Sequence, residues 1–390
     1  MKDSFTIISS PSVRDGSLLS LTESRSRYML PFGGKFRVVD FTLRNSSALG
    51  AAYTVLYTDI DDGLEKYVTY RDIHEEEHVA HLVRVETSAG IRDFLSMLNE
   101  TSTSYYIIYN GDNPSIIDFQ SIVSKFMKKG TDSVLYLIEI DGKATMANKI
   151  LITTKKALQK AVKKAVKEDR HAPNLVEMVV NMVINQGVRR ETHKVHYWPI
   201  NTIPDYYKLT REIIWDNEIF SLLHKERIIK SRIFAEGYAH LGKHADVTNS
   251  FISDYCQING RVENSIIYPG VIVDEKAEII DSILLPFSHV GRGASIIRSV
   301  VDETTEESNL ENNVGVYCNV GKIEDERIRN EDFPQSIYSG ITLIGQNCRI
   351  PDRVKIGGAC YVASKMDAEN FGNTKVVHDG VSVLPHVDTL

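Results

Sequence analysis

Four cysteines are the residues whose chemistry is easiest to test from spacing, because thiolates bind metals and form disulfides. They are Cys256, Cys318, Cys348 and Cys360, all in the second half of the chain. None belongs to a Cys-x-x-Cys pair, so the spacing argues against a zinc site. Free cysteine is among the most buried residue types, and we expect four small buried side chains in a reducing compartment.

An aspartate, Asp112, lies just beyond a predicted buried strand at Tyr105–Tyr109. Ligands of parallel α/β sheets in general bind beyond the carboxyl ends of the strands. The surrounding Asn110-Gly-Asp-Asn-Pro is also turn-prone by composition alone. A structural turn residue therefore stays an open alternative for Asp112.

The elements that would position such a site alternate along the first half of the chain. Apolar runs predict buried strands, and amphipathic segments between them predict helices, so we expect a mostly parallel, Rossmann-like sheet with helices on both faces. The predicted strands are 5–9, 52–58, 105–109 and 133–140. The predicted helices are 41–48, 62–75, 91–99, 122–129 and 155–168.

Length and charge limit the classes of function. A chain of 390 residues predicts two domains, and a net charge of −7 argues against general affinity for nucleic acid or anionic membrane. The lysine-rich helix 155–168 could contact nucleic acid, but a solvated face is the usual meaning of such a pattern. No run of 18 apolar residues predicts a membrane span, and the N-terminus lacks an apolar signal-peptide core, so we expect a cytoplasmic protein.

The second half carries a repeat. Similar segments contain Ser250, Ser265, Ser282 and Ser299 at spacings of 15, 17 and 17 residues, and aliphatic residues recur about every six positions between them. This hexapeptide period predicts a left-handed parallel β-helix from about residue 229 to 390, following an α/β domain of residues 1–228. We expect inward-pointing Ile267, Val273, Ile279, Leu285, Val290 and Ile296, and corner glycines at 260, 270, 291 and 293.

Two passages carry a resemblance to a known family. Leu30–Asn45 (LPFGGKFRVVDFTLRN) resembles the PFGGKYRIIDFPLSN block of the ADP-glucose pyrophosphorylases, also called glucose-1-phosphate adenylyltransferases. The run Ser250–Val301 is similar to the β-helix of the same family. Shorter passages resemble the family's SGDH, GTADA and YWRDVGTI blocks and lie at 110–112, 86–90 and 197–203.

The resemblance implies a chemistry that joins ATP to a sugar 1-phosphate with release of pyrophosphate. In the family a glycine-rich loop with an arginine approaches the triphosphate, and two carboxylates hold Mg²⁺. Here the loop aligns with 11–22, where Ser12 and Val13 replace glycines and Ser17 replaces the arginine. Arg14 and Arg27 are the remaining vestigial catalytic candidates, because Arg27 takes the place of the family lysine.

Other family features are absent from this sequence. Asp112 matches the metal-binding aspartate of SGDH, whereas the second metal carboxylate has become Pro199 or Ile200. Glu86 replaces the glycine that admits the base. Only 31 residues separate Asp112 from Ala144, and no Glu-Lys-Pro motif occurs among them, so the segment that holds glucose 1-phosphate is predicted to be deleted.

These losses favour a non-catalytic or weakly active regulatory subunit of glucose-1-phosphate adenylyltransferase. We expect a catalytic paralogue or a homo-oligomer as partner, in a tetramer like its relatives, with no cofactor required. The alternative is an active sugar-1-phosphate nucleotidyltransferase that uses Arg14, Arg27, Asp112 and Mg²⁺. A third interpretation is an acyltransferase with His289 as its catalytic histidine, since hexapeptide β-helices are common in that class.

Lys35 and Arg37 lie in the best-preserved block. Basic residues of this region bind phosphorylated effectors in the family. The resemblance therefore implies that Lys35 and Arg37 bind effectors such as nucleotides or sugar phosphates. The alternative is a surface loop with solvated charges. We expect Asp40 to pair with a cation or to cap the helix that follows it.

Overall fold

The computed structural model describes residues 4–10, 16–58, 60–74, 82–87, 91–140, 142–168, 174–225, 229, 237–305, 313–322 and 326–385. For residues 70–74, 82–87, 145–148 and 175 it describes the backbone alone. Contacts divide the chain into two compact units. The first contains Met1–Arg14, Arg25–Leu30 and Arg37–Pro199, and the second contains Asp15–Ser24, Pro31–Phe36 and Ile200–Leu390.

The first unit is built on a seven-stranded, mostly parallel sheet in the order β10-β8-β9-β6-β1-β4-β5. Strand β9 alone runs antiparallel to its neighbours β6 and β8. The Rossmann-like sheet predicted from the alternating pattern is therefore confirmed. The strands are β1 (Phe5–Ser9), β4 (Tyr53–Thr58), β5 (Leu82–Thr87), β6 (Tyr105–Tyr109), β8 (Ser133–Ile140), β9 (Lys143–Thr154) and β10 (Arg189–Lys194).

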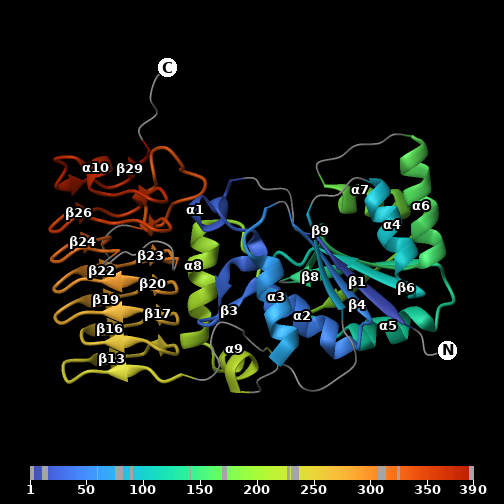
Figure 1. Ribbon diagram of the computed structural model, residues 1–390, viewed down its shortest axis with the longest axis horizontal. Helices are drawn as coiled ribbons and strands as arrows, with labels where there is room; N and C mark the ends of the chain where they lie inside the picture. Colours follow the sequence, from blue (N-terminus) through green and yellow to red (C-terminus); the bar gives the residue numbers. More distant parts are fainter. Residues whose placement is uncertain are drawn as a thin grey trace. The chain divides into compact units, whose positions relative to one another are not determined.

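Helices cover both faces of this sheet (Figure 1). A two-stranded antiparallel sheet of β7 (Ser115–Ile116) and β11 (His196–Tyr197) lies beside it in the first unit. The helices are η1 (Arg27–Met29), α2 (Val38–Leu49), α3 (Leu64–His74), α4 (Ile91–Glu100), α5 (Phe119–Met127), α6 (Lys155–Lys167) and α7 (Leu175–Ile184).

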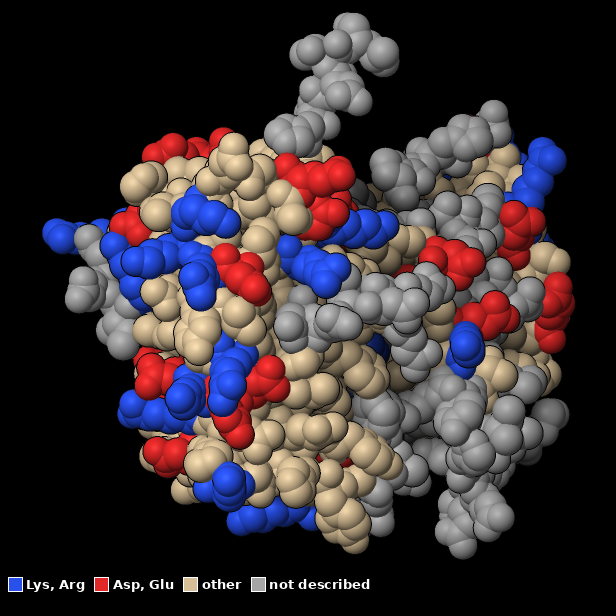
Figure 2. Space-filling view, turned by 60° about the vertical axis from the view of Figure 1, so that its left-hand side comes forward, with Lys and Arg blue, Asp and Glu red and all other residues tan. Residues whose placement is uncertain are grey.

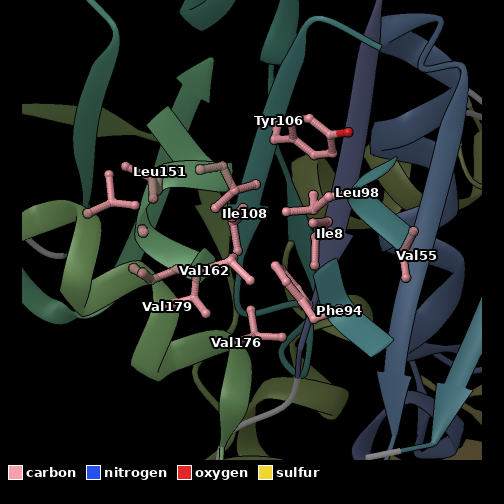
Figure 3. Close-up of a cluster of buried hydrophobic side chains, with 14 of the residues drawn as sticks. Ile8, Val55, Phe94, Leu98, Tyr106, Ile108, Leu151, Val162, Val176 and Val179 are labelled. Carbon is pink, nitrogen blue, oxygen red and sulfur yellow. The ribbon is translucent and has the colours of Figure 1, made fainter. Parts of the chain in front are cut away.

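Two buried clusters show how alternate residues of the strands supply opposite faces. Ile8 and Ile108 pack with α4, α6 and α7, and Figure 3 shows them among Phe94, Val162 and Val176. The preceding residues, Ile7 and Ile107, belong to the other cluster, which includes α5 side chains. On α6 the predicted apolar face is confirmed by the complete burial of Leu158, Ala161, Val162 and Ala165.

Two helices begin three residues before their predicted starts. Helix α2 begins at Val38 and not at Phe41, because Asp40 stands at its third position and accepts a hydrogen bond from the backbone N–H of Arg37 at 2.9 Å. Helix α5 begins at Phe119 and not at Ile122, because Asp118 caps it through Ser121 N at 3.0 Å. The prediction that Asp40 caps a helix is thus right in kind, but wrong about the residue at which the helix begins.

The second unit contains a left-handed parallel β-helix. Its coils contribute strands to three parallel sheets, ordered β12-β15-β18-β21, β13-β16-β19-β22-β24-β26-β28 and β14-β17-β20-β23-β25-β27-β29 (Figure 1). Equivalent residues of successive coils lie in register, as in Val247, Val262, Ile279 and Ile296. The hexapeptide repeat predicted from sequence is therefore confirmed.

Most of these strands are only two or three residues long. The first coils contain β12 (His240–Leu241), β13 (Asp246–Thr248), β14 (Phe251–Ile252), β15 (Gln257–Ile258), β16 (Arg261–Glu263), β17 (Ile266–Ile267), β18 (Ile272–Val273), β19 (Glu278–Ile280) and β20 (Ile283–Leu284). The later coils contain β21 (His289–Val290), β22 (Ser295–Ile297), β23 (Ser299–Val301), β24 (Asn319–Val320), β25 (Thr342–Ile344), β26 (Lys355–Ile356), β27 (Tyr361–Val362), β28 (Val376–Val377) and β29 (Ser382–Val383).

The interior of the β-helix is aliphatic, as predicted. The six residues expected to point inward, from Ile267 to Ile296, are completely buried. Gly270 has φ +74°, and a Cβ there would lie 2.7 Å from the ring of Phe287. Gly260 has another reason to be glycine, since a Cβ would lie 2.3 Å from the carbonyl oxygen of Ala277 in the next coil.

The four cysteines are free and buried in this unit, which confirms their predicted structural role. Burial raises the pKa of Cys256 and Cys348 to about 12 and that of Cys360 to about 11. These thiols are therefore protonated at neutral pH and poor nucleophiles. Each also donates a hydrogen bond to a carbonyl further along the chain, as Cys256 does to Tyr268 at 3.1 Å.

Several short helices group with the β-helix in the second unit. The guanidinium of Arg211 in α8 donates a hydrogen bond to a carboxylate oxygen of Asp281 at 2.6 Å and also donates to the carbonyl of Asn264, so α8 is fixed to the corners of two coils.

The predicted domain boundary after residue 228 stays a prediction. The helices of this unit are α1 (Ser20–Glu23), α8 (Ile203–Arg211), η2 (Glu212–Ile214), α9 (Asn217–Phe220), η3 (Ser221–Lys225) and α10 (Ala368–Phe371). Its strand β2 (Pro31–Phe32) pairs with β3 (Phe36–Arg37), of which Phe36 belongs to this unit and Arg37 to the first.

Charge is mixed on the surface seen in Figure 2, where Lys and Arg side chains lie among those of Asp and Glu. Ion pairs such as Arg292–Glu275 and Arg261–Glu263 contribute to this mixing in the β-helix. Among the described helices, none is long and apolar enough to cross a membrane.

Candidate functional site

The candidate site lies in the first unit, beyond the carboxyl ends of β1 and β6. These strands are parallel neighbours, paired from Phe5–Tyr105 to Ser9–Tyr109, so both strands end at the same edge of the sheet. Asp112 follows β6 by three residues and is only 1% exposed. This is the edge of the sheet at which open α/β sheets bind ligands.

Asp112 and Arg27 both act on the phenol of Tyr197. Burial chiefly raises the pKa of Tyr197 above its ordinary value, and the negative charge of Asp112 raises it further. The side chain of Asn113 and the positive charge of Arg27 act in the opposite direction. The structure therefore brings two predicted site residues, Asp112 and Arg27, to the surroundings of one hydroxyl group.

A second tyrosine, Tyr28, is also affected by the charge of Asp112. Tyr28 is completely buried, and its hydroxyl lies 2.8 Å from Oγ of Ser9 at the end of β1. Burial holds the pKa of Tyr28 well above its usual range, the hydrogen bond with Ser9 lowers it, and the charge of Asp112 raises it again. A neutral phenol thus lies near Asp112, close to the end of β1.

The loop that carries Asp112 is tightly packed. A Cβ on Gly111 would lie 2.0 Å from Oγ of Ser9 and 2.7 Å from Oγ1 of Thr42, so only glycine fits there without a shift. Asn45 of α2 holds the following segment from both sides. Its Nδ2 donates to the carbonyl of Ser115 at 2.9 Å, and its Oδ1 accepts from the N–H of Ile117 at 3.0 Å.

The described residues do not form a magnesium site by themselves. No group of three His, Cys, Asp or Glu side chains suited to a metal occurs among them. Asp112 has tyrosines and Asn113 nearby, and one carboxylate binds Mg²⁺ weakly. Arg14 lies outside the described residues, and so does the side chain of Glu86.

Much of the chain between Asp112 and Ala144 forms regular structure. Strand β7, helix α5 and strand β8 follow one another, β8 ends at Ile140 and β9 begins at Lys143. Strand β9 then pairs antiparallel with β6, from Tyr109–Ile150 to Tyr105–Thr154. The pairings of β9 with β8 and β6 place these three strands side by side in the sheet.

Lys35 belongs to the second compact unit and Arg37 to the first. In the second unit, Lys35 lies over the ring of Phe36 at 5.9 Å, and its charge contributes to lowering the pKa of His224 to about 4, an effect due chiefly to burial. In the first unit, Arg37 donates to the carbonyl of Met29. Whether these two cations bind an effector stays a prediction.

The glycine pair before Lys35 has a structural explanation within the second unit. Gly33 and Gly34 have φ of +65° and +86°, and a Cβ on Gly34 would lie 2.5 Å from the ring of Phe251. His224 stacks on Phe36 at 5.3 Å and approaches Phe251 to 4.6 Å. The preserved block is therefore required by packing, whatever its functional role.

His289, the histidine of the acyltransferase alternative, lies in β21. Its Nε2 is 3.3 Å from a carboxylate oxygen of Asp274, and its backbone N–H donates to Oδ1 of Asn313 at 2.8 Å. These contacts fix it between neighbouring coils. They give His289 a structural role that needs no acyl donor.

The sheet, its ligand-binding edge and the β-helix together define a nucleotidyltransferase-like α/β unit in one chain with a hexapeptide unit. Residues 236–319 match the family described as GlmU-like, C-terminal hexapeptide. The chain is also similar to a glucose-1-phosphate adenylyltransferase of Bacillus cytotoxicus, with 23% identity over 332 residues that cover 73% of this chain and 88% of the relative. This confirms the predicted resemblance to that family.

Two further relatives carry the same name. The protein of Bacillus thuringiensis (strain Al Hakam) is 21% identical over 332 residues, again 73% of this chain and 88% of the relative. The protein of Acetivibrio thermocellus is 30% identical over 181 residues, which cover 46% of this chain and 40% of the relative. The chain is thus related to the glucose-1-phosphate adenylyltransferases, while that last match spans less than half of the relative.

Sequence reasoning missed the tyrosines of the site. The sequence patterns give no role to Tyr28, and Tyr197 enters only as part of the short resemblance at 197–203. Tyr28 directly follows Arg27 and precedes the preserved block, and an aromatic residue beside a predicted catalytic cation was the available signal.

Proposed function

We propose that this chain is a non-catalytic or weakly active regulatory subunit of glucose-1-phosphate adenylyltransferase, which modulates ADP-glucose synthesis for glycogen formation. The observation that carries the proposal is the crowded edge of the sheet. Ser9, Tyr28 and Asp112 are each no more than 1% exposed there. A working site must keep room at this edge for a nucleotide and a sugar phosphate.

The short interval before β9 supports the same conclusion. Helix α5 and strands β7 and β8 occupy 19 of the 31 residues between Asp112 and Ala144. The sequence at Ser12, Val13 and Ser17 lacks the glycines and the arginine of the family's phosphate loop. Weak nucleotide binding with little turnover is the expected consequence.

The proposed partner is a catalytic paralogue, in an oligomer that we expect to be a tetramer. We propose that the β-helix and the preserved block at Leu30–Asn45 serve assembly and response to effectors, and that Thr42 and Asn45 of this block also pack the loop that carries Asp112. Lys35 and Arg37 are the proposed contacts for phosphorylated effectors, which would be nucleotides or sugar phosphates. The four buried free thiols support a reducing compartment, and we propose the cytoplasm.

An active sugar-1-phosphate nucleotidyltransferase is the second candidate. One observation supports it: the charges of Asp112 and Arg27 both act on the phenol of Tyr197, so a carboxylate and a cation lie in the surroundings of one hydroxyl group. Mg²⁺ would then be required to neutralise phosphate charge. Residues of the chain other than those described would have to complete its coordination.

Co-purification with a catalytic paralogue tests the first candidate. The tagged chain should recover that paralogue from native lysate in a defined ratio, and its addition should change the paralogue's response to effectors. Light scattering at micromolar concentration should give the mass of an oligomer. A monomer that recovers no adenylyltransferase and leaves its activity unchanged would contradict the proposal.

A further inference from the structure

A cavity of about 480 Å³ lies in the first unit, and its lining differs from the group of residues around Asp112. Its wall comes from three separate places in the sequence: the end of α2, the segment that leads from β7 into α5, and the connection between β10 and β11. Ser9, Tyr28, Asp112 and Tyr197 do not line it. Its volume is within the range of small-molecule sites.

Arg44 supplies the fixed positive charge of this cavity. Its NH1 group donates to Oδ1 of Asn45 at 3.1 Å and, at 3.4 Å, to the carbonyl of Ile117. The remaining guanidinium nitrogens have no protein acceptor within the described part of the chain. Burial lowers the pKa of Arg44, and the charge of Asp118 only partly offsets this effect, so an additional anion would stabilise the guanidinium.

Further donors come from the opposite wall. Lys194 is largely exposed, with only a 3.5 Å contact to Glu139, and the imidazole of His196 has no hydrogen-bond partner among the described residues. Asp118 is the one carboxylate among the described lining residues. Its Oδ1 accepts the N–H of Ser121 as the cap of α5, so part of its hydrogen-bonding capacity is already used within the helix.

Apolar side chains complete the lining. Ile116 and Phe119 are buried beside the cations, and Val195 is partly buried between Lys194 and His196. Because the cavity is much larger than a phosphate ion, an organic group attached to the anion would have an apolar surface to contact. The arrangement combines a guanidinium, an ammonium and an imidazole with that surface.

We propose that this cavity binds a small phosphorylated molecule, with the phosphate held by Arg44, Lys194 and His196 and its organic part against Ile116 and Phe119. The guanidinium matches phosphate geometry, which allows two parallel hydrogen bonds. The proposed site is independent of Lys35 and Arg37 and of whether the chain turns over ATP.

Calorimetric titration of the full-length chain with two probes, inorganic phosphate and phenyl phosphate, tests this proposal at constant ionic strength. Both should bind saturably, and phenyl phosphate more tightly because its ring contacts the apolar wall. Arg44→Gln should weaken both by about tenfold or more, since it removes charge-assisted hydrogen bonds. Arg92→Gln, the same change on the exposed face of α4, should leave both affinities within about twofold.

Two further variants protect the test against misfolding of Arg44→Gln. His196→Gln and Lys194→Gln change exposed side chains, and each should weaken phosphate binding while thermal unfolding stays unchanged. Lys35→Gln should leave phosphate binding unchanged. The proposal is overturned if no saturable binding occurs, if Arg44→Gln and Arg92→Gln behave alike, or if Lys35→Gln alone abolishes binding.

Discussion

The hydroxyl of Tyr28 lies 2.8 Å from Oγ of Ser9, and both side chains are completely buried at the end of β1. Ser9 is the last residue of the strand, at the edge of the sheet where a ligand would bind. The hydrogen-bonded Tyr28 side chain occupies space at this edge. This packing agrees with the proposal that the chain has little or no catalytic activity.

Tyr28→Phe should destabilise the protein by about 1–3 kcal/mol, because a buried Ser9 hydroxyl loses its partner. Urea unfolding gives the free energy of unfolding of both proteins. Tyr317→Phe is the matched control, since Tyr317 is 51% exposed, and it should change stability by less than about 0.5 kcal/mol. Equal stability of Tyr28→Phe and the wild type would show that the contact is not important for folding.

Gly111→Ala should cost about 1–3 kcal/mol, because the new Cβ would overlap Ser9 and Thr42 in a packed interior. Gly358→Ala is a suitable control, since a Cβ there meets Lys322 Cγ at an ordinary 3.4 Å. Thermal unfolding of both variants makes the comparison. If Gly111→Ala is tolerated as well as Gly358→Ala, the loop at Asp112 is looser than described.

Val273→Asp should destabilise the β-helix by several kcal/mol, on the order of 4, because it buries an unpaired charge in the completely buried interior. Gln257→Asp places the same carboxylate on the exposed side of neighbouring strand β15 and should be nearly neutral. Denaturant unfolding followed by circular dichroism distinguishes the two. Similar losses for both variants would contradict the inward orientation of Val273.

Stability should fall steeply above pH 10, because burial raises the pKa of Tyr109 to about 12. Above the ordinary tyrosine pKa of about 10 the unfolded chain loses this proton first, so the unfolded state binds fewer protons and stability decreases as pH rises. The contribution is fully present below pH 10 and is lost as pH rises through about 12.

Urea unfolding at pH 9, 10 and 11 measures this loss. Tyr109→Phe should reduce the slope by up to about 1.4 kcal/mol per pH unit, whereas Tyr317→Phe should leave it unchanged. A slope in Tyr109→Phe equal to that of the wild type would mean that Tyr109 titrates normally in the folded protein.

The sequence predicted the elements that depend on local pattern. Strands β1, β6 and β8 have the bounds expected from their apolar runs, and the coils follow from a period that repeats over many residues. Helix α2 was placed three residues late, because its start depends on a hydrogen bond between Asp40 and the backbone of Arg37. Such a contact is not visible in apolar periodicity.

The site itself could be predicted only in part. Asp112 was expected at the end of β6 because its position follows directly from the strand. The hydrogen bond between Tyr28 and Ser9, and the effect of the Asp112 and Arg27 charges on Tyr197, involve residues that are separated in the sequence. They depend on how the sheet and its loops pack, which spacing along the chain does not determine.

A pyrophosphate-release assay on the purified chain tests the central claim, that its catalytic site no longer works, most directly. With ATP and glucose 1-phosphate, and with other nucleotides and sugar phosphates, we expect little or no turnover. Loss of one charge-stabilising group typically costs roughly 10²–10³ in rate, and the proposal has several such groups absent from this chain. In a complex with a catalytic partner, Asp112→Asn should leave the rate nearly unchanged, whereas robust turnover by the isolated chain that Asp112→Asn abolishes would contradict the account.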